Sequence, residues 1–494
     1  MNYIGIDLGT TNSVGCIVRN GKFEYLKFHN SDLLPSAILY KDGKVSVGVT
    51  AKRKSVIYAE HYIASAKTYM GSDKIWKIAD KTFTPTDVAT EVLKTIYKEA
   101  KKFFKNDEDV EAVITTPAYF SGNQNEETRD AGIRAGFKVK QILAEPVAAA
   151  LAYAFDGLKD KEKIYVVDLG GGTFDVSLLQ VDGKNSYTTL MKDGDRRLGG
   201  DDFDKVIQNM MFSEIRKTAG INLDKEETSG LAHDVYTKTC QKLLTEAEKI
   251  KCNLSESDTE DVNIVNLFPL GADFYDLEMT ITKDDFLREA SSLVRKIENT
   301  IRHSFDDIEY TPEDVDRVIL VGGSARMPFV RKFVEKFFNK PVYANKDLSK
   351  LVAMGAALLA NDEDNTITLN DMIAHSLGIR VIGDRVDRLS IILKKNSHYP
   401  CENTGEYTTV HDYQESINVE VYEGECEEDI NQNEPCGGFL LTGIEQARAG
   451  VPQIEVTFSF DESCILHVTA YDKKTGSQNS KNLQIKRIRA HTEG

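Results

Sequence analysis

The sequence lacks several features that mark specialised classes of protein. It contains no run of 18 apolar residues, and its N-terminus enters a strand-like segment without a basic start or an apolar signal core. No low-complexity tract and no Lys/Arg-rich run stand out among its 494 residues, and the formal net charge is -17. These absences argue against membrane partners and against electrostatically driven nucleic-acid binding, and they favour a cytoplasmic protein.

Paired metal-binding and disulfide patterns are also missing. The nine histidines show no His-x-x-x-His spacing, and the seven cysteines contain no Cys-x-x-Cys pair. Scattered cysteines in odd number predict free thiols in a reducing compartment, and no transition metal held by the protein. The cysteines are Cys16, Cys240, Cys252, Cys401, Cys426, Cys436 and Cys464.

The sequence does contain three apolar strands that each run into glycines. Residues 164–175 read IYVVDLGGGTFD, residues 3–14 read YIGIDLGTTNSV, and residues 318–328 read VILVGGSARMP. Consecutive glycine N–H groups can bind an anion, and a carboxylate at a strand end can hold the waters of Mg²⁺. One such run alone is more typical of a β-turn. Two Asp-Leu-Gly hairpins together predict a duplicated domain whose halves clamp one nucleotide.

Three other places in the sequence contain candidate functional residues, and each of them also has a simple structural explanation. Lys67 lies among small and apolar residues, although an isolated lysine is usually a solvated surface charge. Glu145 begins a predicted helix just before Pro146, where an acid also serves as a simple N-terminal charge. Glu248 and Lys251 share a helix face, for which an exposed ion pair worth about 0.3 kcal/mol is the default interpretation.

The pattern of apolar and polar residues changes after Ala360. Helical and strand patterns alternate before it, as in the predicted helices 86–104 and 124–135. We predict an α/β domain over 1–364, a linker over 365–371 and an all-β sandwich of about eight strands over 372–490. The strand-like segments of the last part are 385–393, 406–411, 417–422, 453–460, 465–471 and 482–488.

Motifs in both parts resemble the DnaK-type 70-kDa heat-shock chaperones over residues 3–488. They are IDLGTTNS (6–13), DLGGGTFD (168–175), LGGDDF (198–203), VGGSARMP (321–328), PQIEVTF (452–458) and ILHVTA (465–470). The resemblance implies an actin-like ATPase fold, with two lobes of two subdomains each, followed by a linker and a peptide-binding β-sandwich. It implies a slow, Mg²⁺-dependent ATPase that uses ATP/ADP, Mg²⁺ and K⁺. The implied partners are unfolded or extended apolar peptides, a J-domain co-chaperone and a nucleotide exchange factor.

The resemblance also implies roles for individual positions. Mg²⁺ waters and monovalent cations would be held by Asp7, Asp168 and Asp175. Hydrolysis would use Lys67, which orients the attacking water, with Glu145, Asp168, Thr173 and Asp7. Nucleotide contacts would come from Gly9, Thr10, Thr11, Asn12, Gly170, Gly171, Gly172, Thr173, Gly199, Gly200, Glu248, Lys251, Ser255, Gly322, Gly323, Ser324 and Arg326. The peptide groove would use Ile379, Val381, Ile382, Tyr407, Val410, Ile417, Val419 and Ile454, which otherwise fit a sandwich core.

The chain departs from the family pattern at several positions. The segment between Lys67 and Thr86 is short, and Cys252 replaces an arginine that stacks on adenine in some members. Only six residues follow Ile488, too few for a helical lid, so we expect a lidless or truncated member with fast, weak peptide exchange.

The segment that connects the two parts also departs from the family. Asn125 stands where the family usually has an arginine, and residues 367–371 are more polar than the usual leucine-rich linker. Because Asn125 cannot form a charge-assisted pair with Asp371, we expect weakened coupling between ATP and peptide. Another basic group, such as Arg129 on the same predicted helix, is the alternative partner.

Other functions share the same core. Sugar kinases and filament-forming proteins also use the actin-like fold, and fold alone does not fix function. A sugar kinase would need a catalytic base between the lobes, and it would not explain the sandwich. A filament protein would polymerise with ATP. A nucleotide-gated peptide-binding module with negligible turnover would differ from a chaperone only in its ATPase rate.

Overall fold

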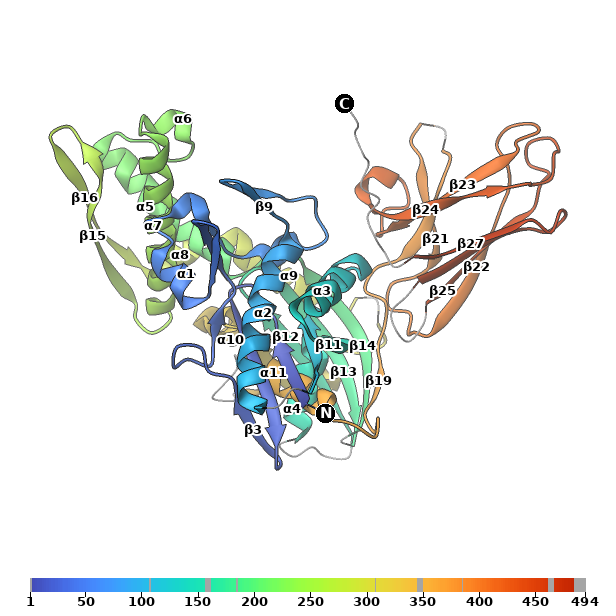
Figure 1. Cartoon of the computed structure of the whole chain (residues 1–494), viewed down its shortest axis with the longest axis horizontal. Coiled ribbons are helices and arrows are strands. Elements are labelled where there is room, and N and C mark those ends of the chain that lie inside the picture. The colour runs from blue at the N-terminus through green and yellow to red at the C-terminus, as the bar shows by residue number, and fades with distance from the viewer. Residues whose placement is uncertain are drawn as a thin grey trace. The chain divides into compact units, whose positions relative to one another are not determined.

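The computed structural model describes residues 2–105, 108–155, 161–183, 185–306, 308–343, 350–383, 385–460 and 466–483. They group into two compact units (Figure 1). Unit 1 comprises Met1–Ala118, Thr128–Asn185 and Asp193–Ile367, and unit 2 comprises Tyr119–Glu127, Ser186–Lys192 and Thr368–Gly494. The last division falls within the predicted linker. The sequence did not predict that 119–127 and 186–192 group with the second unit.

The first sheet of unit 1 is built around β1. Its strand order is β11-β10-β1-β2-β3, and β4 pairs with β2. β1 runs parallel to β10 and antiparallel to β2. The bounds are β1 (Asn2–Asp7), β2 (Asn12–Arg19), β3 (Lys22–Tyr25), β4 (Leu34–Pro35), β10 (Val110–Thr116) and β11 (Lys138–Ala144).

The second sheet of unit 1 repeats this arrangement around β12. β12 is antiparallel to β13 and parallel to β17, which in turn is parallel to β18. Each central strand therefore lies between a hairpin partner and a parallel strand, as expected for the duplication predicted from the two Asp-Leu-Gly hairpins. The bounds are β12 (Lys161–Leu169), β13 (Phe174–Asp182), β17 (Arg317–Val321) and β18 (Val342–Tyr343).

The helices of unit 1 follow from capping and apolar periodicity. Thr84 and Asp87 form a capping box at the start of α2, whose apolar face packs on β1 and β10 through residues such as Leu93 and Ile96. α4 and α11 approach so closely that a Cβ on Gly355 would lie 1.7 Å from Ala148 O. The helices are α1 (Val49–Lys54), α2 (Pro85–Phe104), α4 (Glu145–Phe155), α5 (Gly200–Ala219), α6 (Glu226–Ser229), α7 (His233–Asn253), α8 (Lys283–Glu289), α9 (Ser291–His303), α10 (Pro328–Phe338) and α11 (Leu351–Ala360). The residues of α3 (Gly122–Ala135) are divided between the two units at Glu127.

Three small sheets complete unit 1. β15 and β16 form a long hairpin beside α5 and α7 (Figure 1), in a segment to which the sequence assigned no strand. The bounds are β5 (Ile38–Lys41), β6 (Lys44–Val47), β7 (Tyr62–Ile63), β8 (Trp76–Ile78), β9 (Lys81–Phe83), β15 (Thr259–Leu270) and β16 (Asp273–Thr282).

Unit 2 contains two four-stranded antiparallel sheets, ordered β21-β20-β23-β24 and β22-β25-β26-β27. Residues of both sheets, among them Val419, Val421, Val456 and Phe458, form one apolar core. In the same unit, β19 runs parallel to residues 186–188 of β14. The bounds are β14 (Ser186–Asp195), β19 (Thr368–Asn370), β20 (Leu377–Val381), β21 (Arg388–Leu393), β22 (Cys401–Tyr407), β23 (Ser416–Glu423), β24 (Glu434–Thr442), β25 (Ile454–Phe460), β26 (Leu466–Asp472) and β27 (Gln478–Leu483).

The mixed α/β part followed by a β-rich part agrees with the sequence prediction, but β20 and β24 were not among the predicted strands, and two predicted strands differ in their bounds. The strand predicted at 406–411 is found at 401–407, because β22 pairs with β25 from Cys401↔Phe460 to Tyr407↔Ile454. The strand predicted at 482–488 is described as β27, which ends at Leu483. Residue 465 and residues 484–490 lie outside the described residues.

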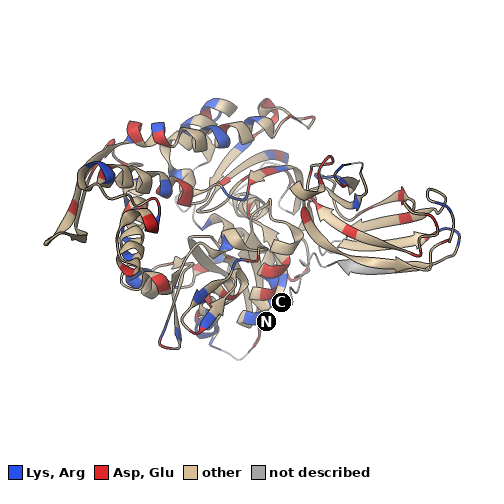
Figure 2. Cartoon of the chain, turned by 90° about the horizontal axis from the view of Figure 1, so that it is seen from above, with Lys and Arg blue, Asp and Glu red and all other residues tan. Residues whose placement is uncertain are grey.

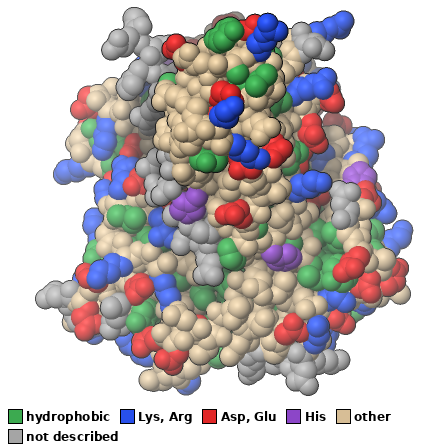
Figure 3. Space-filling model, turned by 90° about the vertical axis from the view of Figure 1, so that its right-hand side faces the viewer, with side chains coloured by type: hydrophobic (Ala, Val, Ile, Leu, Met, Phe, Trp, Pro, Cys, Tyr) green, Lys and Arg blue, Asp and Glu red, His purple; other side chains and the backbone are tan. Residues whose placement is uncertain are grey.

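Charged and apolar residues are mixed in the two further views of the molecule (Figure 2 and Figure 3). Basic and acidic residues are interspersed along the chain (Figure 2), and in the face drawn in Figure 3 hydrophobic side chains form scattered groups among charged ones. No helix in the described part of the chain combines the length and apolar composition needed to cross a bilayer. The six described cysteines are free thiols, and Cys464 lies outside the described residues.

Candidate functional site

Two hairpins of unit 1 bring the predicted phosphate-binding residues together. Residues 8–11 join β1 to β2, and residues 170–173 join β12 to β13. A Cβ on Gly171 would lie 2.0 Å from Thr11 Oγ1, and one on Gly172 would lie 3.0 Å from Thr10 Cγ2. Any side chain at Gly171 would therefore push the two hairpins apart, which explains the glycines physically.

The loops of the other glycine motifs meet the same region. The Gly200 N–H donates to Gly170 O at 3.0 Å, and the Asp201 N–H donates to Gly171 O at 2.7 Å. A Cβ on Gly200 would lie 2.3 Å from Ser324 Oγ, so the loop after β17 lies beside the start of α5. The structure thus brings together the candidate residues Gly170, Gly171, Gly200 and Ser324.

Lys67 and Glu145 form a buried ion pair at this site. Lys67 lies in the short 3-10 helix Ala66–Tyr69, and Glu145 is the first residue of α4. Lys67 Nζ donates to Glu145 Oε1 at 2.7 Å, and each residue is 7 % exposed. The surface interpretation of Lys67 is therefore wrong, because apolar residues such as Ala66 and Met70 bury the segment around it.

Carboxyl groups gather around this pair. β1 ends at Asp7, while Asp168 and Asp175 are cross-strand partners at the end of the β12–β13 hairpin. Burial, with the neighbouring Glu145, raises the pKa of Asp7 to about 7, whereas Lys67 opposes the shift. Burial, with the charges of Glu145, Asp175 and Asp7, also raises the pKa of Asp168 well above its ordinary value.

These carboxyl groups fit a cation that is held through water. Four acids lie within electrostatic reach of one another, and Lys67 opposes the raised pKa of both Asp7 and Asp168. Their mutual repulsion would fall if a further cation entered. In the described residues, no three His, Cys, Asp or Glu side chains are grouped so as to ligate a metal ion directly. Carboxylates commonly hold Mg²⁺ through its bound waters, so the chemistry of these four acids fits a hydrated cation.

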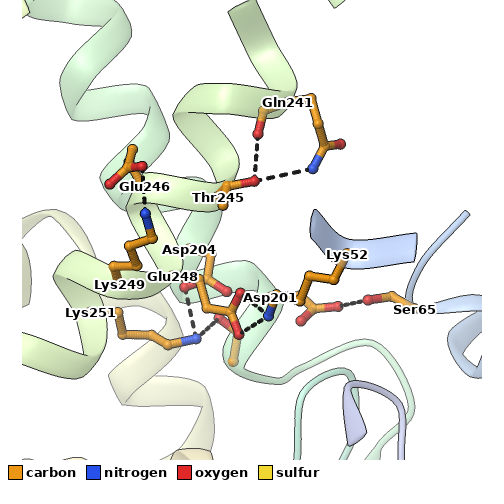
Figure 4. A network of polar contacts seen from close by, with 11 residues as sticks. Lys52, Ser65, Asp201, Asp204, Gln241, Thr245, Glu246, Glu248, Lys249 and Lys251 are labelled. Atoms are coloured by element: carbon orange, nitrogen blue, oxygen red, sulfur yellow. Dashed lines mark hydrogen bonds and ion pairs between the residues drawn. The ribbon is translucent and has the colours of Figure 1, made fainter. Parts of the chain in front are cut away.

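A second polar network surrounds the predicted adenosine residues (Figure 4). Lys251 Nζ lies 2.7 Å from Asp204 Oδ1 and donates to Gly200 O at 2.9 Å. Lys52 Nζ lies 2.7 Å from Glu248 Oε2, which joins α1 to α7. Burial raises the pKa of Asp204 to about 6, although Lys251 opposes the shift.

This network corrects one sequence interpretation. The spacing of Glu248 and Lys251 predicts an exposed ion pair between these two side chains. In the structure, Glu248 pairs with Lys52 and Lys251 pairs with Asp204. Lys251 is also buried, so its charge requires a close partner. The local spacing rule fails here because distant segments offer each side chain a different partner.

Sequence reasoning missed several residues of the site. Ser65 has left-handed backbone torsions and donates to Asp201, so it links the segment before Lys67 to the start of α5. Ser36 supports the first hairpin, because its Oγ donates to Gly9 O at 2.7 Å and its N–H donates to Thr11 O at 2.9 Å. No sequence motif marked Ser36, Lys52 or Ser65. Asp201 directly follows Gly200 and Asp204 lies one helical turn later, so their closeness to the glycine motif was an available signal.

The remaining adenosine candidates lie on two elements near this network. Ser255 follows α7, and its Oγ donates to Lys251 O at 3.2 Å. Gly322, Gly323, Ser324 and Arg326 lie on the loop after β17, where Ser324 is buried and Arg326 is exposed. The neighbouring Cys252, which replaces the family's arginine, is exposed.

The predicted peptide-binding residues divide into two groups in unit 2. Ile379, Val419 and Ile454 belong to the buried core, and Val381, Tyr407 and Ile417 are partly buried against it. Ile382 and Val410 are 62 % and 47 % exposed. The core interpretation therefore holds for the first three residues, while Ile382 and Val410 present apolar surface that the sandwich does not need for packing.

Comparison with known proteins places the chain in a family. The profile of the family described as "Hsp70 protein" matches residues 3–78 and 73–493. "Chaperone protein DnaK" of Thermotoga neapolitana and of Thermotoga maritima are each 38 % identical over 489 residues, which is 97 % of this chain and 79 % of theirs. "Chaperone protein DnaK" of Thermosipho africanus is 37 % identical over 487 residues, with the same coverage.

The match to the family spans the glycine hairpins, the Lys67–Glu145 pair and both sheets of unit 2. It confirms the resemblance that the sequence motifs indicated. The chain is a member of the Hsp70 family.

Proposed function

We propose that this protein is an ATP-dependent chaperone that binds extended apolar segments of unfolded proteins. It hydrolyses ATP in unit 1, binds peptide on unit 2, and exchanges peptide at a rate set by the bound nucleotide. The observation that carries the proposal is the buried Lys67–Glu145 pair beside Asp7 and Asp168, at the point where two glycine hairpins meet. Membership of the Hsp70 family supports ATPase activity.

Unit 1 acts as an actin-like ATPase with two lobes of two subdomains each. The equivalent placement of β1 and β12 in their sheets supports this assignment. A duplicated fold of this kind presents one glycine hairpin from each half to the same ligand. ATP would therefore bind where residues 8–11 meet residues 170–173, and its hydrolysis would be slow.

The acids of the site would hold the cations of the reaction. Asp7, Asp168 and Asp175 would bind the waters of Mg²⁺ and, at its side, a monovalent cation such as K⁺. Mg²⁺ would neutralise charge that develops on the phosphates. The raised pKa values of Asp7 and Asp168 support this role, because closely spaced carboxylates ionise together only when a cation accompanies them.

The chain's own groups would position the attacking water. Lys67 Nζ is fixed by Glu145 Oε1 at 2.7 Å, so its remaining N–H groups can be directed at a water and a phosphate oxygen. The Thr173 hydroxyl lies on the second hairpin and would help to orient the same water. Such pre-positioned charge is the main means by which enzymes of this class accelerate phosphoryl transfer.

The base and sugar of the nucleotide would lie between α7 and the loop after β17. Glu248, Lys251 and Ser255 would face them from one side, and residues 322–326 from the other. The network of Figure 4 supports this placement, because it fixes Glu248 and Lys251 by partners outside their own helix. Gly323 supports it as well, because a Cβ there would meet nothing within 4 Å.

Peptide would bind to the sandwich in an extended conformation. Ile382, Val410 and Ile417 would contact its side chains, because these three residues are at least partly exposed. Ile379, Val381, Tyr407, Val419 and Ile454 would support that surface from below. Main-chain hydrogen bonds would supply affinity independent of sequence, and the apolar side chains would supply selectivity.

A chaperone that alternates between ATP hydrolysis and peptide release would need partner proteins. A J-domain co-chaperone would stimulate hydrolysis, a nucleotide exchange factor would release ADP, and the setting would be the cytoplasm.

One experiment tests the proposal. The ATPase rate and the dissociation rate of a fluorescent apolar peptide are measured on the same sample, each with and without the other ligand. The chaperone predicts Mg²⁺-dependent turnover that peptide stimulates, and peptide release that ATP accelerates. Release that responds to ATP without measurable turnover would instead identify a nucleotide-gated binding module. Independence of the two activities would refute the coupled function.

A further inference from the structure

Asp371 in the predicted linker has a basic partner that no sequence motif indicates. Lys192 Nζ, from β14, lies 2.7 Å from Asp371 Oδ2 and also donates to Met372 O at 3.2 Å. The two side chains are 5 % and 15 % exposed, so both charges are largely removed from water. A buried lysine and a buried carboxylate each need the other, because either one alone would be costly to bury.

The sequence pointed to a different partner. Asn125 cannot carry charge, and its Oδ1 is buried without a hydrogen-bond partner. Arg129, the suggested substitute, donates from Nη1 to Val139 O at 3.3 Å. Within unit 2, the basic group that pairs with Asp371 is Lys192, which no sequence pattern indicated.

Asp371 also forms hydrogen bonds with two other residues of unit 2 through its side chain and its backbone carbonyl. The Met372 N–H donates to Asp371 Oδ1 at 2.9 Å, and the Tyr399 hydroxyl donates to Oδ2 at 3.3 Å. The Tyr399 N–H donates to Asp371 O at 3.1 Å. The carboxylate thus joins three segments of the unit, namely β14, the linker and the loop before β22.

A second contact fixes the same loop to β14. His398 Nε2 lies 2.7 Å from Thr189 O, and since a carbonyl only accepts, Nε2 must carry the proton that is donated. β19 adds main-chain pairing, in the register Ser186↔Thr368 to Thr188↔Asn370. The linker strand is therefore seated on β14 by main-chain pairing, a histidine contact and one buried ion pair.

β14 also leads directly to the phosphate site. Two residues after Lys192 the chain reaches Gly194, where a Cβ would lie 2.6 Å from Phe174 O and 3.2 Å from Asp175 Oδ1. Asp175 is one of the acids proposed to hold cation waters. A shift of the second hairpin would therefore be passed along β14 to Lys192 through the backbone.

We propose that Lys192 is a positioning residue that couples nucleotide to peptide, by holding Asp371 and the linker strand on β14. The pair provides a two-state element, because both charges are satisfied in the seated arrangement and both become hydrated when the strand leaves. This inference rests on the proposed function, and it would allow coupling to persist although Asn125 and a polar linker depart from the family pattern.

The test uses the full chain and the peptide-release assay. The variants are Lys192→Met, Asp371→Asn, the double variant of both, and the charge reversal Lys192→Asp with Asp371→Lys. Lys394→Met removes an exposed lysine of the same unit and is the matched control. Thermal unfolding followed by circular dichroism identifies any variant that does not fold.

We expect Lys192→Met and Asp371→Asn each to reduce the acceleration of peptide release by ATP at least about fivefold. The double variant should lose no more than either single one, and the charge reversal should restore part of the acceleration. Basal ATPase activity without peptide should stay close to that of the wild type. Lys394→Met should behave as the wild type does.

Amide hydrogen exchange of residues 368–371 in ATP gives a second readout that does not involve peptide. Exchange should be faster in Lys192→Met than in the wild type, because the strand leaves β14 more often. Unchanged exchange and unchanged release in a folded Lys192→Met protein would overturn the proposal, as would additive losses without rescue by charge reversal. A wild type whose peptide release ignores ATP would instead overturn the proposed function itself.

Discussion

Lys67 Nζ and Glu145 Oε1 lie 2.7 Å apart in a pair of residues that are each 7 % exposed. The pair lies beside Asp7 and Asp168, whose pKa values are raised by burial and by neighbouring acids. Lys67 opposes the raised pKa of both carboxyl groups, and in the proposed function it also directs N–H groups at the attacking water. Variants can separate these two roles.

Lys67→Ala should lower ATP turnover by roughly 10²-fold or more, because a pre-positioned charge is lost at the reacting phosphate. ATP affinity should change little, since the adenosine candidates lie elsewhere. The apo protein should also lose stability, about 3 kcal/mol or more, because Glu145 is left buried without its partner. Single-turnover kinetics and equilibrium ATP binding measure the two effects.

The double variant Lys67→Met with Glu145→Gln is the control for this prediction. Replacing a buried ion pair by neutral side chains of similar volume is often nearly neutral for stability. The double variant should therefore regain stability while turnover stays low. Turnover that recovers together with stability would assign Lys67 a purely structural role.

The raised pKa of Asp7 predicts that the stability of the nucleotide-free protein depends on pH. Its pKa is about 7 in the folded protein against an ordinary value of 3.8, so the folded state binds the proton more tightly than the unfolded state does. The contribution of Asp7 to stability is fully present below pH 4 and is lost as the pH rises through about 7. Between pH 5.5 and pH 8, the apo protein should therefore lose thermal stability, at least in part because of Asp7.

Asp7→Asn should flatten this profile and raise the unfolding temperature of the apo protein at pH 8. It should also remove the extra stability that Mg²⁺ with ATP gives the wild type at that pH, an effect that EDTA should abolish in the wild type. Asp364→Asn, at an exposed position, is the control. An identical slope in wild type and Asp7→Asn would contradict the assignment.

Cys252 offers a test of the adenosine site without any mutation. It follows Lys251 on α7, and in the described part of the chain it is the exposed cysteine. Burial raises the pKa of Cys16 to about 12, so that buried thiol should stay unreactive at neutral pH. Partial burial also raises the pKa of Cys252, so its earlier labelling is expected from its exposure to solvent. A maleimide should therefore label Cys252 early, as mass mapping of the labelled peptides can measure.

Bound ATP should slow the labelling of Cys252 about tenfold when its concentration is about ten times the Kd. Cys401, a partly buried cysteine of unit 2, reports any general effect of ATP on labelling. Protection at both cysteines would indicate a global change in the protein. Labelling of Cys252 at the same rate with and without ATP would place the adenosine elsewhere.

The sequence predicted the features that are local in the chain. An apolar strand, an acid and a run of glycines are adjacent residues, so the two hairpins and the duplication could be inferred from their repeated pattern. The start of α4 at Glu145 was predicted for the same reason, because Pro146 marks the first helical turn. The roles proposed for Lys67 and Glu145 could be inferred only from the resemblance to a family.

Features that depend on distant partners could not be predicted. Lys52 and Glu248 are 196 residues apart, and Lys192 and Asp371 are 179 residues apart. No local rule identifies such pairs, and the local rule for Glu248 and Lys251 gave the wrong partner. The predicted bounds of β22 were wrong for the same reason, because its pairing with the distant strand β25 sets where it begins and ends.

The exposed apolar residues of unit 2 give the last prediction. Ile382 and Val410 are 62 % and 47 % exposed, whereas Val419, on β23, is 2 % exposed in the core. A carboxylate at either exposed position remains hydrated, so the fold should tolerate Ile382→Asp and Val410→Asp within about 0.5 kcal/mol. Val419→Asp buries an unpaired charge and should unfold the sandwich.

Peptide binding should separate these variants further. If Ile382 and Val410 contact the apolar peptide, each aspartate should weaken binding at least about tenfold, because it places charge against the apolar side chain of the ligand. Ile417→Trp should also block binding, since Ile417 is partly exposed on the same sandwich. Fluorescence anisotropy measures the affinity, and circular dichroism shows that the variants are folded. A folded Val410→Asp protein that binds apolar peptide normally would place the groove on another face of unit 2.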